Sequence, residues 1–309
     1  MVKGIQAVSS KPSASSERHP WGWIGSYVPR TRLQSRRHSR GCLELCVTII
    51  AVEDRPAIAK PLVTTPPMPR EHGAWGILLI PFATAVGVSG VFDLKVALLL
   101  ASVLCFYMAR TSFLKNDTRW TGLLLATSFA CVFLLLVLWR LWWVIAFGAV
   151  AAPLAFRKTE RNVAMQLVAV AGLTLTAPAA WYVATSQIDR RAWLLWLLNA
   201  LYFAGGVFYV KMHVSAAIRR TPFVSLAEKV QHGAAVLAYH AGMVVVLLAL
   251  VSSGVVSFWV SLAYAPVVLR AFVGVGRLGP TLRIKRLGWT EVAYSLVYAV
   301  VLVGAFRFG

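Results

Sequence analysis

The side chains best suited to chemistry stand where a polar leader meets the first long apolar run. Residues 70–75 place three ionisable side chains in succession, followed by small residues and a tryptophan. A helix dipole favours a carboxylate at its N-terminus, which accounts for the glutamate but not for the arginine and histidine beside it. The Gly-Ala step lets another helix approach closely. We therefore predict that this segment contributes to a binding pocket through Arg70, Glu71, His72, Gly73 and Trp75.

Other polar residues lie at the ends of the apolar runs that follow and between them. Asn116 and Asp117 follow the second run, Arg161 closes a short loop of alternating charge, and Lys211 ends the sixth run. Basic side chains and amides in this arrangement would suit an anionic head group or phosphate. The ordinary alternatives are a lysine that reaches the membrane interface and local ion pairs of little energetic value. We include these four residues in the candidate pocket.

Two ionisable residues fall inside apolar runs. His240 lies within the seventh run and Glu291 near the start of the ninth. A polar group within a membrane needs a partner, so each is a functional candidate, for proton or cation handling in the case of the glutamate. Its nearest sequence partners are Arg283, Lys285 and Arg286, so an interfacial salt bridge is the competing interpretation. His232 and His240 are two helical turns apart, too far for one ion, and we predict neither metal nor cofactor.

The elements that position these residues are membrane helices. The chain is 59% hydrophobic and only 14% charged, whereas soluble domains carry about 25% charged residues. We predict an all-α, polytopic transmembrane bundle of about nine spans. The predicted spans are 73–91, 94–109, 121–139, 141–156, 162–184, 192–210, 233–252, 255–275 and 289–306.

Two features qualify this division into spans. The third and fourth spans are separated only by Arg140, but as one helix they would extend about 54 Å across a hydrocarbon core of about 30 Å. Pro178 predicts a kink in the fifth span, and Pro266 lies inside the eighth.

Charge predicts the orientation. With the N-terminus in the cytoplasm, the inner loops hold 15 Lys and Arg residues and the outer segments five, a bias that alternates loop by loop. We therefore predict a cytoplasmic N-terminus, an external C-terminus and location in the cell membrane. The net charge of +20 then favours anionic membrane lipid as a partner and argues against nucleic acid, since no soluble basic domain accompanies it.

Residues 1–67 form a separate basic region, and residues 68–309 the membrane domain. The leader is rich in Ser, Pro, Lys and Arg, and its apolar run 43–52 is too short to span a bilayer. We predict that it is largely disordered. Met68 stands directly before the candidate segment and is an alternative translation start.

Several motifs resemble one family of membrane proteins. Pro69-Arg70-Glu71-His72-Gly73-Ala74-Trp75, with Leu78-Leu79-Ile80-Pro81-Phe82 after it, is similar to the opening of the YwiC-like membrane proteins. The resemblance covers about residues 68–309 and implies an integral membrane fold without a particular activity. Its further similar pieces are 157–161, 177–180, 209–211, 239–240, 269–270 and 287–291.

Nine spans with polar inner loops also resemble the architecture of UbiA-type intramembrane prenyltransferases. Those enzymes hold Mg²⁺ and a diphosphate on Asp-rich motifs after the second and sixth helices. Here the first such loop offers only Asn116-Asp117 and the second only Glu228, a poor Mg²⁺-diphosphate site. Three hypotheses remain: a lipid-modifying or isoprenoid-modifying enzyme with a cytoplasm-facing pocket for an anionic small molecule or head group, a small-molecule or ion transporter, and a non-catalytic membrane scaffold.

Overall fold

The computed structural model describes residues 72–156, 162–219, 221–279 and 284–309, with side chains from Trp75 to Pro153 in the first range and from Arg286 onward in the last. The predicted leader, Met68, Arg70, Glu71 and Arg161 lie outside these residues. Within them every regular element is an α-helix, which confirms the all-α prediction. The helices are α1 (His72–Ser89), α2 (Leu94–Leu114), α3 (Thr118–Trp139), α4 (Trp143–Phe156), α5 (Val163–Leu173), α6 (Thr176–Thr185), α7 (Arg190–Arg219), α8 (Leu226–His232), α9 (Ala234–Ser252), α10 (Phe258–Leu262), α11 (Ala265–Gly276) and α12 (Ile284–Phe308).

The helices have the length and composition of a multi-span membrane protein. In the described part of the chain, seven segments are long and apolar enough to cross a bilayer, and two apolar helices, Trp75–Ser89 and Trp143–Pro153, are shorter. Helices satisfy their backbone hydrogen bonds internally, which is what the bilayer core requires. The spanning segments are Leu94–Leu114, Thr118–Trp139, Val163–Thr185, Arg190–Arg219, Ala234–Ser252, Phe258–Gly276 and Arg286–Phe308. The count of nine and the orientation stay predictions.

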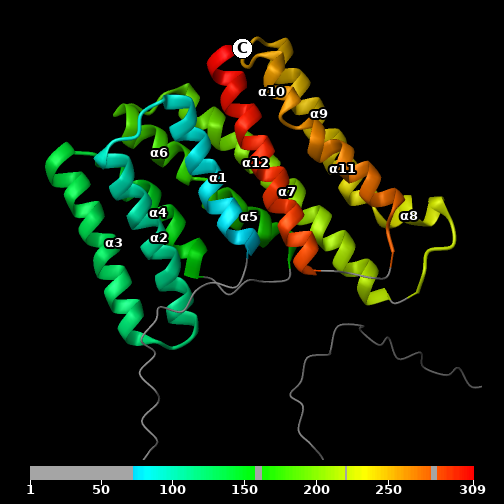
Figure 1. The fold of residues 1–309 in the computed structure, drawn as a ribbon, viewed down its shortest axis with the longest axis horizontal. Helices are drawn as coiled ribbons and strands as arrows, with labels where there is room; N and C mark the ends of the chain where they lie inside the picture. Colours follow the sequence, from blue (N-terminus) through cyan, green and yellow to red (C-terminus); the bar gives the residue numbers. More distant parts are fainter. Residues whose placement is uncertain (1–71, 157–161, 220, 280–283) are drawn as a thin grey trace, which may run out of the picture. The chain divides into compact units, whose positions relative to one another are not determined.

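Helix α1 is central to the packing. It contacts α6, α7 and α12, while α2 and α3 form a hairpin at one edge and α9 and α11 lie at the opposite edge (Figure 1). A Cβ atom at Gly87 would lie 2.6 Å from the Val303 Cγ2 atom of α12, so glycine permits this close crossing. The turn between α2 and α3 and the end of α7 lie at one end of the bundle, opposite the C-terminus (Figure 1).

The predicted division at Arg140 is observed. Helix α3 ends at Trp139, Arg140 adopts a left-handed backbone with φ of 55°, and α4 begins at Trp143. The Arg140 amide donates to the Leu136 and Leu135 carbonyl groups, the pattern of a left-handed helix cap. The outer face of α3 exposes large apolar side chains such as Phe129 and Phe133, as expected of a helix that faces lipid.

Proline interrupts two of the spanning segments. Proline has no N–H to offer the carbonyl group four residues earlier. At Pro178 this carbonyl belongs to Thr174, between α5 and α6, where the Ala177 amide donates to it instead at 3.0 Å. At Pro266 it belongs to Leu262, the last residue of α10. The predicted kink in the fifth span is therefore a break, and the eighth span is broken in the same way.

Candidate functional site

Most of the acidic side chains in the described residues have structural roles. Asp93, Asp117 and Asp189 each accept a hydrogen bond from the backbone N–H three residues later, at 3.1, 3.2 and 3.1 Å. Such bonds satisfy amides that the first turn of a helix leaves unpaired. Asp117 thus caps α3, and Asn116 beside it supplies the left-handed residue of the α2–α3 turn, with φ of 56°. The structure thus gives Asp117 the role of a cap and Asn116 that of a turn residue, and their predicted place in a pocket stays a prediction.

Glu228 is also held locally. Its carboxylate accepts hydrogen bonds from the Val224 amide at 2.9 Å and from the Arg219 guanidinium. The Val224 N–H, followed by Arg219, lowers the pKa of this carboxyl below its ordinary value. These contacts fasten the connection between α7 and α8 and do not form a pocket.

Glu291 differs from these carboxylates because it pairs with a charge inside the bundle. Its Oε1 atom accepts a hydrogen bond at 2.6 Å from Nη1 of Arg270, which α11 contributes. The side chains are only 7% and 21% exposed for Arg270 and Glu291. Glu291 was predicted as a site residue with Arg283, Lys285 or Arg286 as its partner. Its ion pair in the described part of the chain is instead with Arg270.

Two aromatic rings enclose the Arg270 guanidinium. Its central carbon lies 4.2 Å from the ring centre of Tyr209 and 4.8 Å from that of Tyr294. Both distances fall within the range of cation–π attraction. Gly274 makes room for Tyr209, since a Cβ atom there would lie 2.6 Å from the tyrosine ring. The Arg270 Nε atom is buried and has no hydrogen-bond acceptor among the described residues.

His240 of α9 and Glu291 of α12 both lie against α7, next to the adjacent residues Gly205 and Gly206. A Cβ atom at Gly205 would be 3.3 Å from Nε2 of His240, and one at Gly206 would be 3.6 Å from Oε2 of Glu291. The histidine is 1% exposed, and its Nδ1 atom lies 2.8 Å from the Val236 carbonyl oxygen. A carbonyl group only accepts, so Nδ1 carries the proton. Nε2 then has no hydrogen-bond partner within the part of the chain that the structure describes.

A cluster of tyrosines lies beside the Arg270–Glu291 pair, further inside the bundle. Tyr202 stacks on Tyr298 with ring centres 3.9 Å apart, and Tyr264 meets Tyr298 edge-on at 5.3 Å. The Tyr264 hydroxyl donates to the Leu198 carbonyl oxygen at 2.8 Å, whereas the Tyr202 hydroxyl is buried without a partner among the described residues.

One face of α7 connects these groups. Asn199 donates to the Thr84 hydroxyl of α1 at 3.0 Å and is fully buried. Asn199, Tyr202, Gly206 and Tyr209 follow one another at spacings of three and four residues, so they lie along one side of the helix. We call the group formed by Asn199, Tyr202, Tyr209, His240, Arg270, Glu291, Tyr294 and Tyr298 the buried polar track.

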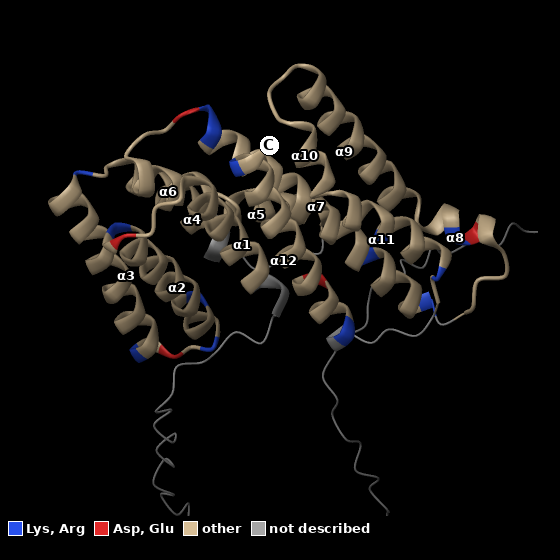
Figure 2. Cartoon of the chain, turned by 45° about the horizontal axis from the view of Figure 1, so that its top comes forward, with Lys and Arg blue, Asp and Glu red and all other residues tan. Residues whose placement is uncertain are grey.

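The remaining predicted residues lie elsewhere. Lys211 is exposed, and the Trp75 ring packs edge-on against Tyr107 with centres 5.3 Å apart. His72 and Gly73 occupy the first turn of α1, and their side chains lie outside the described residues. That Asn116, Asp117 and Lys211 line one inner-face pocket stays a prediction. Figure 2 shows that Lys, Arg, Asp and Glu gather mainly at helix ends and connections.

Arg270 is the residue that sequence reasoning missed. It was grouped with the inner loop charges, whereas the structure buries it within α11. The available signal was an arginine inside an apolar run, one turn after a proline.

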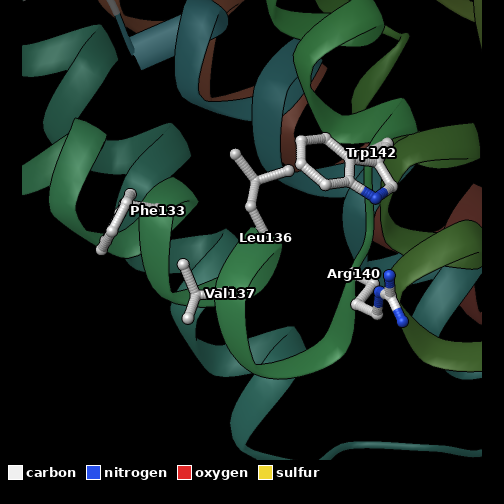
Figure 3. A pocket seen from close by; sticks show the side chains of 5 residues that line it. All are labelled: Phe133, Leu136, Val137, Arg140 and Trp142. Atoms are coloured by element: carbon white, nitrogen blue, oxygen red, sulfur yellow. The ribbon is translucent and has the colours of Figure 1, made fainter.

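A surface hollow lies apart from the buried polar track. It is formed by the end of α3 and the connection to α4, and its lining is Phe133, Leu136, Val137, Arg140 and Trp142 (Figure 3). Apart from the Arg140 guanidinium and the Trp142 indole N–H the lining is apolar, so it offers a ligand no acceptor and no second charge. We therefore centre the candidate site on Arg270 and Glu291.

The helices and the ion pair define a multi-span, all-helical membrane protein with a charged pair among its spanning helices. A family model described as YwiC-like protein matches residues 68–181. The chain is also 26% identical over 247 residues to the "Uncharacterized protein YwiC" of Bacillus subtilis (strain 168), covering 76% of this chain and 96% of the Bacillus protein. No solved structure matches. The chain is accordingly similar to the YwiC-like proteins, in agreement with the resemblance of its opening motif.

Proposed function

We propose that this protein is a membrane transporter for a small solute and that the Arg270–Glu291 pair is its binding site. The observation that carries the proposal is a paired arginine and glutamate among apolar spanning helices, next to a histidine with an unused ring nitrogen. Ionisable groups within membrane segments commonly mark substrate or proton pathways.

The energetic cost of the pair supports a functional role. Placing one arginine at the centre of a spanning helix costs about 2.5–3.5 kcal/mol on insertion scales. A buried ion pair is often no more stable than apolar residues of similar volume. Stability alone therefore gives little reason for Arg270 and Glu291, whereas solute binding gives one.

The broken helices provide a second line of support. Interrupted membrane helices often form the moving or ligand-binding parts of transporters. Pro266 lies next to the break between α10 and α11, and Arg270 follows one turn later within α11. A change of angle at this break would move the guanidinium relative to Glu291 on α12.

The buried polar track also favours transport over the alternatives. The residues of this track extend from Arg270, which contacts Tyr209, along one side of α7 to Asn199 inside the bundle. The enzyme hypothesis has less support, because Asn116 and Asp117 form a cap and a turn and Lys211 is exposed. The scaffold hypothesis would require the ion pair to act only in folding.

Flux measurements separate these functions. Purified protein would be reconstituted into liposomes that enclose a pH-sensitive dye, and the internal pH and the uptake of each solute would be recorded after concentration jumps of chloride, phosphate, lactate and protons. We expect a response to at least one solute from wild type and from Glu228→Gln, but none from the Arg270→Met/Glu291→Met double variant. Equal uptake by the double variant and wild type, or no uptake of any solute by wild type, would contradict the proposal.

A further inference from the structure

We infer that the Arg270 guanidinium binds a small carboxylate anion and that Glu291 occupies this binding position until a proton neutralises it. The inference rests on the proposed transport function and deepens it by naming the substrate class and the coupling ion. It starts from the 2.6 Å hydrogen bond between the two side chains.

Arg270 and Glu291 differ in whether a proton can remove their charge. A guanidinium stays charged at every accessible pH, so Arg270 always needs an anion inside the bundle. A carboxylate can lose its charge by taking up a proton. Protonation of Glu291 would therefore leave Arg270 without a counter-charge, and a free anion would replace the lost carboxylate.

The surroundings of Arg270 suit a planar anion. Glu291 engages Nη1, whereas Nε is buried and has no acceptor among the described residues. A guanidinium binds carboxylates through pairs of parallel N–H groups, so the Nε side offers a place where an anion can first bind. The rings of Tyr209 and Tyr294 flank the guanidinium and would limit thick or strongly hydrated ligands.

Few neighbours can compete for the proton. Phenols ordinarily titrate near pH 10, so the tyrosines stay neutral between pH 5.5 and 7.5. The sequences of α10 and of α1 from Trp75 onward contain no titratable side chain. Two histidines, His213 and His240, interact electrostatically with Arg270 and are the competing proton acceptors. The titratable and charged side chains described in the neighbouring elements are Arg190, Arg191, Tyr202, Tyr209, Lys211, His213, Arg219, Glu228, Lys229, His232, Tyr239, His240, Tyr264, Arg277, Arg286, Tyr294, Tyr298 and Arg307.

The exchange balances in charge. The pair begins as a guanidinium cation and a carboxylate anion. One proton converts Glu291 to its neutral acid, and one anion then neutralises Arg270. The site gains a proton and an anion together, so a transport cycle built on it moves no net charge.

Binding of potassium acetate by purified protein in detergent tests this exchange. Affinity would be followed by tryptophan fluorescence and thermal stability at pH 5.5 and 7.5, with potassium chloride at matched ionic strength as reference. For wild type we expect the apparent affinity to fall up to about tenfold per pH unit once Glu291 is ionised, because each anion requires one proton. Glu291→Gln resembles the protonated acid and should bind acetate equally well at both pH values.

Three controls identify the groups responsible. Glu228→Gln removes a carboxylate outside the spanning segments and should keep the wild-type pH dependence. Arg270→Met/Glu291→Met removes both charges without leaving one uncompensated, and should lose acetate binding while still folding. His240→Gln and His213→Gln should retain the pH dependence.

Four results would overturn the inference. Two concern affinity: wild-type acetate affinity that does not change with pH, and acetate affinity of Glu291→Gln that is no higher than that of wild type at pH 7.5. The other two are acetate binding by the double variant and loss of the pH dependence in either histidine variant. Proton uptake into the liposomes without acetate binding would leave transport standing and remove this inference. Acetate binding without uptake of any solute would leave the binding exchange standing and remove transport.

Discussion

The energetic coupling between Arg270 and Glu291 can be measured with a double-mutant cycle. Arg270→Met leaves the Glu291 carboxylate buried without its cation. Breaking a buried pair on one side costs about 3–5 kcal/mol, and the 21% exposure of Glu291 places this variant near 3. Glu291→Met should cost less, about 2 kcal/mol, because Arg270 retains its cation–π contacts with Tyr209 and Tyr294.

The double variant should be much less destabilised than its two parents together. With both charges removed we expect a change within about 1 kcal/mol of wild type, hence a coupling energy of roughly 4 kcal/mol. The free energy of unfolding would be measured by SDS titration in mixed micelles, with tryptophan fluorescence as the signal. Arg277→Met is the matched control, because it removes an exposed arginine next to α11 and should change stability by less than about 0.5 kcal/mol. Additive single variants would refute the view that the pair is electrostatically coupled.

Three further predictions concern other parts of the fold. Gly87→Val should lower stability by about 1–3 kcal/mol, because its side chain meets Val303 on α12, and adding Val303→Ala should recover part of this loss in the same SDS titration. Asp117→Ala should cost about 1 kcal/mol through the lost α3 cap and leave acetate affinity unchanged; a large loss of binding would restore Asp117 as a site residue. The pKa of Glu228 is lowered in the folded state, so its contribution to stability is present above its ordinary pKa and disappears as pH falls through the lowered value. Protection of the Val224 amide, measured as its exchange rate relative to the intrinsic rate at the same pH, should accordingly persist until pH drops below the usual range of glutamate pKa values. Loss of protection at or above that range would show that the hydrogen bond to Glu228 does not persist.

Sequence reasoning predicted the helical segments well, since each predicted span overlaps described helix. Arg140 marked the end of α3 because a charged residue between two apolar runs interrupts a span. Pro178 and Pro266 located the two broken segments because the missing amide hydrogen is a local property of the residue. Orientation and the number of crossings depend on the membrane itself and stay predictions.

Side-chain partnerships were harder to predict. Glu291 was identified as a candidate because a carboxylate near an apolar run is unusual, and its nearest basic residues were named as partners. Its partner Arg270 is 21 positions away in the sequence and meets it through the packing of α11 on α12. Asp117 was assigned to a pocket although its position before a helix is equally typical of a cap. Which role such a side chain takes depends on the contacts between helices, and the hydrophobic pattern of the sequence does not specify those contacts.

Proton uptake on anion binding tests the central claim most directly. Acetate would be added to weakly buffered protein near pH 7, and the protons taken up would be counted with a pH-sensitive dye against the acetate bound. For wild type we predict about one proton for each acetate, because Glu291 must be neutralised before Arg270 accepts the anion, and for Glu291→Gln we predict almost none. Acetate bound by wild type without proton uptake, or the same uptake by Glu291→Gln, would contradict the proposed exchange at this site.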